Sequence, residues 1–201
     1  MAYELQEEEK RLLDFEFFKP TFETGSLGNG ATEIMTKPVT NAQFCIYLNY
    51  AFMDKKIEID GNGKVVDSES KDLLMDLDNS DIYLEDGKFI VNEDKYENRV
   101  TGITYVIAEM FILWLSKLHK VNYKISEFWG NYSDRDGVFD IDSFKSYPLS
   151  YEFYYFTYQQ KFKICPNLTT GNFHLNQGTI KNDYTSKETS FRMMKLPAEA
   201  K

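Results

Sequence analysis

A chain of 201 residues with 42% hydrophobic and 27% charged residues has the composition of a globular protein and enough length to bury a core. Its formal net charge of −9 argues against a nucleic-acid partner, because binding to a phosphate backbone requires a clustered basic surface. No uncharged apolar run reaches the roughly 18 residues of a membrane-spanning helix, and the acidic N-terminus does not resemble a secretory signal. We therefore expect no membrane partner and a cytoplasmic location.

The first elements predicted along the chain are short. Residues 4–13 predict a helix or an acidic arm, and the aromatic run 15–22 predicts a strand that Pro20 interrupts. Three glycines in 25–33 predict a loop. Because the arm ends in phenylalanines, it has the composition to dock on a neighbouring subunit, and a homo-oligomer is one arrangement that we expect.

The segment 40–51 predicts a capped amphipathic helix. Thr40 or Asn41 supplies a side-chain oxygen that can accept hydrogen bonds from backbone N–H groups two or three residues later. The apolar residues that follow at helical spacing are Phe44, Tyr47, Leu48 and Ala51. This helix is predicted from local signals alone.

Two hairpins and a second helix follow. Residues 57–67 alternate around a Gly-Asn-Gly turn, and residues 82–91 do so around Asp86-Gly87, with an acidic stretch between the two hairpins. From 104 to 118, an apolar stripe predicts a helix with positive charge near its C-terminal end. The stripe consists of Ile107, Met110, Phe111, Trp114, Leu115 and Leu118.

The last third of the chain is aromatic and β-prone over 147–165 and polar beyond it. Because the strands and helices do not alternate as βαβ units, the order predicts an α+β fold. We expect an N-terminal arm and first strand in 1–24, one domain in 25–197 and a tail in 198–201.

Three stretches carry a resemblance to a known family. PVTNAQFCIYLN (38–49) is similar to a V-T-N-x-x-[FY]-x-x-F-L-N box, 75–117 to a G-K-F-x-V strand with a Y-E-N-x-P-V turn and a helix, and SFRMMK (190–195) to a closing G-F-R strand. Together they resemble the formylglycine-generating-enzyme (sulfatase-modifying factor) family. The resemblance implies a C-type-lectin-like fold, with two helices packed on a twisted, mostly antiparallel sheet and with long loops. Beyond the first box, the matching positions are Gly87, Lys88, Phe89, Val91, Tyr96, Glu97, Asn98, Val100, Ala108, Trp114, Leu115, Phe191 and Arg192.

The chain departs from the family where chemistry is concerned. The proline after Y-E-N is Arg99 here, the Ser-Trp that opens the family's helix is Thr104-Tyr105, and the C-terminal half is short. Copper-dependent members use two nearby cysteines in that half, where this chain has Cys165 alone.

Two thiol alternatives follow. Cys45 lies next to the apolar face of its helix and is predicted to be a small buried hydrophobe. Cys165 with His119 or His174 is a conceivable nucleophilic site, although a cap interaction at the helix end is the simpler interpretation of His119.

A metal site is the next candidate. SDRDGVFDID, residues 133–142, brings four carboxylates around a glycine turn, and hard oxygen ligands at alternating positions can wrap a calcium ion. C-type-lectin-like folds often hold structural calcium in such loops, so the resemblance favours this ion, and a solvated acidic turn is the alternative. No other cofactor is expected. The candidate ligands are Asp134, Asp136, Asp140 and Asp142.

The hypothesis that combines these observations is a non-enzymatic interaction or structural module that binds a protein or a glycan. The resemblance also suggests a component of a larger assembly, such as a bacteriophage particle, and then a virion location. The alternative is a divergent oxidase or a sulfur-transfer enzyme. Tyrosines offer a large contact area at a low entropic cost, so the candidate binding residues are Tyr151, Tyr154, Tyr155 and Tyr158.

Overall fold

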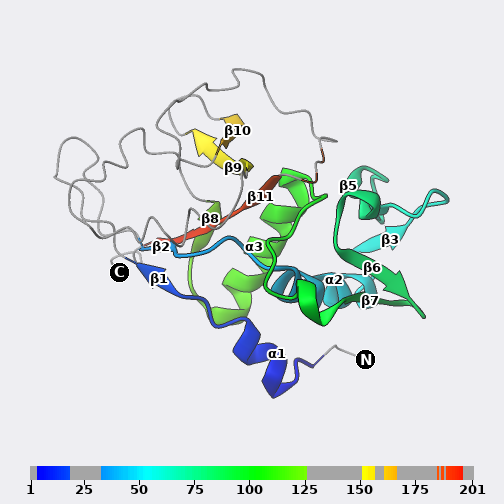
Figure 1. Cartoon of the computed structure of the whole chain (residues 1–201), viewed down its shortest axis with the longest axis horizontal. Coiled ribbons are helices and arrows are strands. Elements are labelled where there is room, and N and C mark those ends of the chain that lie inside the picture. The colour runs from blue at the N-terminus through cyan, green and yellow to red at the C-terminus, as the bar shows by residue number, and fades with distance from the viewer. Residues whose placement is uncertain are drawn as a thin grey trace.

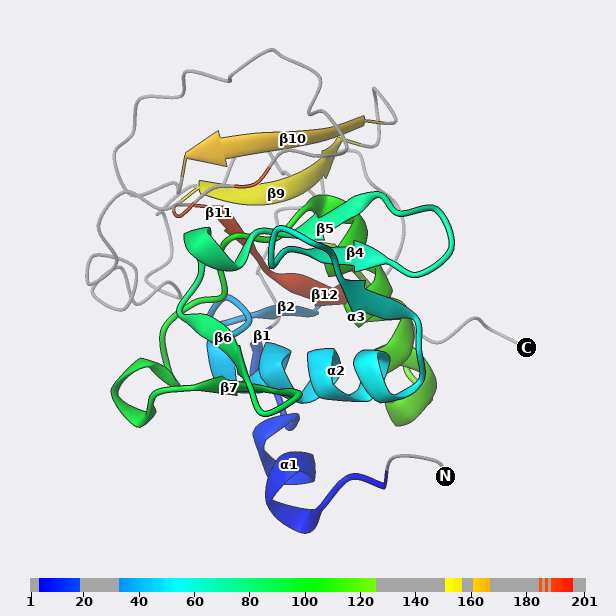
Figure 2. The ribbon, with the colours of Figure 1, turned by 90° about the vertical axis from the view of Figure 1, so that its right-hand side faces the viewer.

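The computed structural model of the chain describes residues 4–18, 33–125, 151–156, 161–166, 185, 187 and 189–196. Two long helices, α2 (Asn41–Met53) and α3 (Tyr105–His119), lie among short strands (Figures 1 and 2). The short helix α1 (Glu7–Leu12) lies at the end of the molecule opposite β9 (Tyr151–Phe156) and β10 (Lys161–Pro166) (Figures 1 and 2). The predicted α+β class is confirmed.

Helix α2 begins with a reciprocal cap. The Thr40 hydroxyl accepts from the Gln43 N–H at 3.3 Å, and the Gln43 side chain accepts from the Thr40 N–H at 2.9 Å. This capping box satisfies two backbone donors that a helix start leaves open. The predicted start at Thr40 is confirmed, and so is the burial of the apolar residues Phe44, Tyr47, Leu48 and Ala51.

Helix α3 is also capped by a threonine. Thr104 accepts from the Ile107 N–H at 3.4 Å, and the residue that follows the helix, Lys120, is its C-cap with a left-handed φ of 55°. Its buried positions are Ile107, Ala108, Phe111, Ile112 and Leu115. The prediction that Leu118 lies on the buried face is wrong, because Leu118 is in the last turn beyond the core and is 42% exposed.

The described strands form four sheets, most of their pairs antiparallel, whereas a single sheet was expected. The largest has the order β1-β2-β12-β8 and is antiparallel throughout, joining β1 (Phe17–Phe18), β2 (Glu33–Met35), β12 (Met193–Lys195) and β8 (Tyr123–Ile125). It joins β1 and β2, from the first part of the chain, to β12, from the last part. In a second sheet, β9 pairs antiparallel with β10 and parallel with β11 (Thr189–Phe191).

Both predicted hairpins are confirmed. The first joins β3 (Ile57–Ile59) and β4 (Val65–Asp67), and β5 (Leu73–Met75) adds a third strand to the pair. The second joins β6 (Ile82–Glu85) and β7 (Lys88–Val91), with Asp86 and Gly87 at φ 50° and 75° in the turn. Positive φ at both turn positions matches the twist of a two-residue hairpin. Within the stretch expected only to be acidic lie β5 and the 3-10 helix η1 (Leu77–Asn79).

The core is an aromatic cluster between α2 and α3. The Phe44 and Phe111 rings stack with centroids 5.4 Å apart, and Phe191 from β11 meets both rings edge-on. The N-terminal segment joins this core, because Leu13 is fully buried and the Phe15 ring contacts that of Phe111 at 6.4 Å. The arm therefore docks on its own chain.

In the part of the chain that the structure describes, none of the helices has both the length and the apolar character that crossing a bilayer would require.

Candidate functional site

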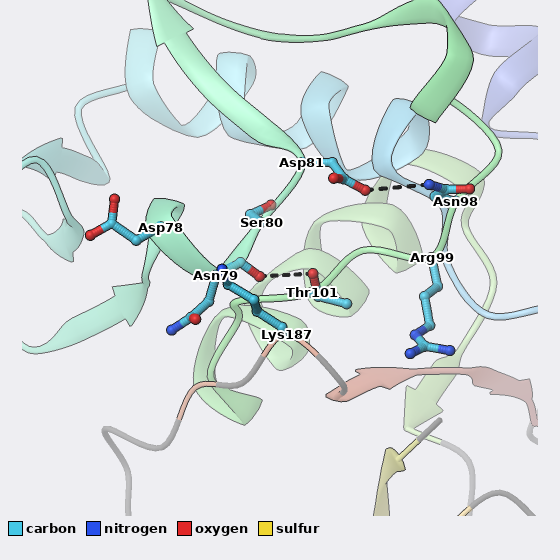
Figure 3. A pocket seen from close by; sticks show the side chains of 8 residues that line it. All are labelled: Asp78, Asn79, Ser80, Asp81, Asn98, Arg99, Thr101 and Lys187. Atoms are coloured by element: carbon cyan, nitrogen blue, oxygen red, sulfur yellow. Dashed lines mark hydrogen bonds between the residues drawn. The ribbon is translucent and has the colours of Figure 1, made fainter. Parts of the chain in front are cut away.

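A polar pocket of about 310 Å³ lies between three segments that are distant in the sequence (Figure 3). One wall is the segment around η1, the second is the turn that follows the 3-10 helix η2 (Glu93–Lys95), and the third is the chain just before β11. Its lining residues are the charged Asp78, Asp81, Arg99 and Lys187 and the neutral Asn79, Ser80, Asn98 and Thr101. This volume is at the lower end of the range for ligand pockets, roughly 300–1,000 Å³, so the pocket suits a small hydrophilic group.

The first wall is held by the carboxylate of Asp76. That carboxylate accepts from the Asp78 N–H at 3.2 Å and from the side-chain Nδ2 of Asn79 at 2.9 Å. Lys64 Nζ lies 2.8 Å from the same carboxylate, and this interaction raises the pKa of Lys64. Because Asp76 is largely buried, it fixes the turn that carries Asp78 and Asn79 into the pocket.

The second wall approaches the first very closely. The Thr101 hydroxyl donates to the Asn79 carbonyl at 2.9 Å (Figure 3), and the Asp76 N–H donates to the Gly102 carbonyl at 2.7 Å. Gly102 has φ +74°, and a Cβ at this position would lie 2.5 Å from the Asp76 carbonyl oxygen. Only glycine fits both the left-handed backbone and this close approach.

One lining residue, Asp81, is held by the start of α2. Asn41 is fully buried, and its Nδ2 donates to Asp81 Oδ2 at 3.3 Å and to the Lys95 carbonyl at 3.1 Å. Asn98 donates to the same Asp81 oxygen at 3.4 Å (Figure 3), so the amides of Asn41 and Asn98 together hold this carboxylate. The Asn41 N–H in turn donates to the Asn98 carbonyl at 2.8 Å.

The three stretches that carry the family resemblance meet beside this pocket. The Val39 N–H donates to the Phe191 carbonyl at 3.1 Å, and the Val100 N–H donates to the Val39 carbonyl at 2.9 Å. The guanidinium of Arg192 donates to the Thr36 carbonyl at 2.8 Å. Residue 39 thus links the Y-E-N turn to the closing strand through backbone hydrogen bonds.

Two side chains from the stretch 38–49, those of Cys45 and Asn49, bind the backbone of Phe89. Asn49 Oδ1 accepts from the Phe89 N–H at 2.8 Å, and its Nδ2 donates to the Phe89 carbonyl at 2.9 Å. The Cys45 thiol donates to that carbonyl at 3.1 Å. Burial raises the pKa of Cys45 from 9.0 to about 12, so the thiol is protonated at neutral pH. The prediction that Cys45 is a small buried group is confirmed.

His119 lies where a helix-end interaction was expected. Its Nδ1 is 3.2 Å from the Tyr123 hydroxyl, and burial lowers the pKa of His119, with the Asp14 carboxylate opposing that shift. Cys165 belongs to β10, of which the structure describes the backbone alone. A thiol site that combines Cys165 with a histidine therefore stays a prediction.

The other predicted site residues are placed only in part. Tyr151, Tyr154 and Tyr155 lie on β9, where Tyr154 pairs with Lys163 and Tyr155 with Phe162, but their side chains are outside the described set. Among the described residues, no group of three or more His, Cys, Asp or Glu side chains is arranged to hold a metal ion. The predicted positions wholly outside the described residues are Tyr158, Asp134, Asp136, Asp140 and Asp142.

No local pattern in the sequence predicts this pocket. Asp78 and Asp81 belong to the stretch described only as acidic, and Arg99 was noted only as a departure from the family pattern. Lys187 carries no local signal. Comparison of the chain with protein-family models, curated proteins and solved structures finds no match.

Proposed function

We propose that the chain is a non-enzymatic binding module of the C-type-lectin-like type and that the pocket between η1 and the 98–101 turn takes a sugar residue of a glycan. The observation that carries the proposal is the chemistry of the lining. The described residues that line the pocket supply two carboxylates, two amides, two hydroxyls and two cations.

This lining matches the hydrogen-bonding character of a sugar. Each sugar hydroxyl both donates and accepts, so it needs acceptors such as Asp81 and donors such as the amide of Asn98 within a short span. The wall residues are held from behind by Asp76 and Asn41, so the polar groups are oriented before a ligand arrives. Preorganisation lowers the entropic cost of binding.

The three resembling stretches, which lie far apart in the sequence, meet at Val39, and this contact is consistent with the proposed architecture. The chemistry of Cys45 favours binding over thiol catalysis. A nucleophilic or metal-binding cysteine acts as the thiolate, whereas burial keeps Cys45 protonated and its hydrogen is engaged with the Phe89 carbonyl.

The test is calorimetric titration of the full chain with a panel of neutral and acidic methyl glycosides, followed by Asp81→Asn. This change keeps an acceptor for Asn41 and Asn98 but removes the charge, so we expect an affinity loss of roughly ten-fold or more, with unchanged folding. Asp86→Asn, at an exposed turn outside the pocket, is the matched control. If Asp81→Asn and Asp86→Asn bind alike, or if no sugar binds, the proposal is wrong.

A further inference from the structure

The pocket contains two cations that a neutral sugar does not require. Arg99 belongs to the turn after η2, and Lys187 belongs to the chain before β11. The two cations therefore come from segments that are far apart in the sequence (Figure 3). The charges of Asp78 and Asp81 balance the two cations in the lining as a whole, so the cations matter through their position in the pocket of a chain whose net charge is −9.

Arg99 is well placed to bind an anion. Its backbone is fixed by the bridge between Thr40 and Arg99, and its side chain is half-buried and extends toward the closing strand in Figure 3. A guanidinium has five N–H donors in a planar fork that matches a carboxylate, so it can bind a ligand while keeping contacts within the chain. Partial burial also strengthens such an interaction relative to open solvent.

We infer that the ligand is an acidic sugar, a ring that carries one carboxylate, with the carboxylate bound by Arg99 and Lys187 and the ring hydroxyls bound by Asp81 and Asn98. The inference rests on the proposed function, because it specifies the sugar that the same pocket takes. One negative charge suits this pocket better than two. A phosphate monoester carries about −1.5 to −2 at neutral pH and would face both Asp78 and Asp81.

The alternative carboxylate ligand is a free amino acid, whose ammonium group would pair with Asp81. The inference favours the sugar because four neutral polar groups line the pocket in addition to the charges. An amino acid with a short side chain would leave most of these donors and acceptors facing water, whereas a sugar ring carries several hydroxyls at neighbouring positions.

The experiment is titration of the full chain with methyl glucuronide, methyl glucoside, glutamate and inorganic phosphate. We expect glucuronide to bind most tightly, and we expect Arg99→Met to weaken glucuronide roughly 10- to 100-fold while leaving the glucoside unchanged, as loss of a charge-assisted hydrogen bond does. Arg99→Lys should restore only part of the loss, because an ammonium cannot bind bidentately. Lys187→Met is the second variant, because the Lys187 side chain is exposed and its replacement should leave folding unchanged. Lys88→Met, at an exposed position of β7, is the control.

The outcomes separate the two proposals. Equal binding of glucoside and glucuronide, with no effect of Arg99→Met or Lys187→Met, would leave a sugar-binding module and overturn the acidic-sugar inference. Tighter binding of glutamate or phosphate than of glucuronide would overturn the inference in favour of that ligand. Failure of every sugar to bind would overturn both the inference and the proposed function.

Discussion

The side chain of Asn49 offers the sharpest test of how α2 holds the β6–β7 hairpin. It is only 8% exposed, and it makes both hydrogen bonds that the backbone of Phe89 can offer on that side, at 2.8 and 2.9 Å. Asn49→Ala removes both bonds in one step. Phe89 N–H then lies in the core beside α2, while its carbonyl keeps the thiol of Cys45 as a donor.

The magnitude follows from these contacts. Each lost hydrogen bond contributes about 1 kcal/mol net, and a buried N–H left unsatisfied costs about 1–3 kcal/mol more. The Phe89 carbonyl adds little to the cost of an unsatisfied group, because the Cys45 thiol still donates to it. We therefore expect Asn49→Ala to lower the free energy of unfolding by about 2–4 kcal/mol. Asn49→Asp keeps the acceptor but turns a carboxylate oxygen toward the Phe89 carbonyl, so it should destabilise as well, and less so at acidic pH, where the carboxyl is protonated.

Urea unfolding gives the free energies, and hydrogen exchange of the Phe89 amide reports the local bond. Asn62→Ala is the control, because Asn62 is exposed in the β3–β4 turn and should change stability by no more than about 0.5 kcal/mol. If Asn49→Ala matched the control in stability and the Phe89 amide stayed equally protected, the proposed role of this amide would be wrong.

Three further predictions concern stability. Gly102→Ala should cost about 2–4 kcal/mol, because a Cβ would lie 2.5 Å from the Asp76 carbonyl at a positive φ, whereas Gly61→Ala, with open space around it, should be nearly neutral in thermal melts. Trp114→Ala should cost about 3 kcal/mol in urea unfolding, since its ring packs at the core edge against Tyr47, Tyr50 and Phe111, and unchanged melting would contradict this core role. The raised pKa of Cys45 means that the folded state binds this proton more tightly than the unfolded chain does. The free energy of unfolding should therefore fall between about pH 9 and about pH 12, by at most about 4 kcal/mol. Over that range the difference in unfolding free energy between the unchanged protein and Cys45→Ala should narrow, and a constant difference would refute the raised pKa.

Local signals were sufficient to predict most of the described secondary structure. Helical spacing of apolar residues predicted both long helices, with a cap at Thr40 or Asn41 for the first, and the Asp-Gly dipeptide predicted the second hairpin. Such patterns, caps and turns depend on residues within a few positions of one another. The exposure of Leu118 could not be predicted this way. Its spacing fits the buried stripe, and only the position of the neighbouring elements shows that the last turn of α3 extends past them.

The pocket could not be predicted, because no short stretch of the sequence contains it. Its walls come from η1, from the turn after η2 and from the chain before β11, and they are joined by contacts such as Thr101 with Asn79 that connect residues 22 positions apart. Such a site arises from tertiary placement. The predicted tyrosine and calcium sites fall on residues whose side chains are outside the described set, so they stay predictions.

The residues that carry the family resemblance and the residues that line the pocket have different roles. The polar groups of Asn41, Asn49 and Val39 form hydrogen bonds with the chain's own backbone and with Asp81. These residues therefore have a structural role that requires no catalytic chemistry. Arg99 replaces the family's proline, and a proline there could offer neither a charge nor a hydrogen-bond donor to a ligand. The polar groups of Asn41, Asn49 and Val39 therefore serve the fold, whereas Arg99 lines the pocket and offers a ligand a positive charge.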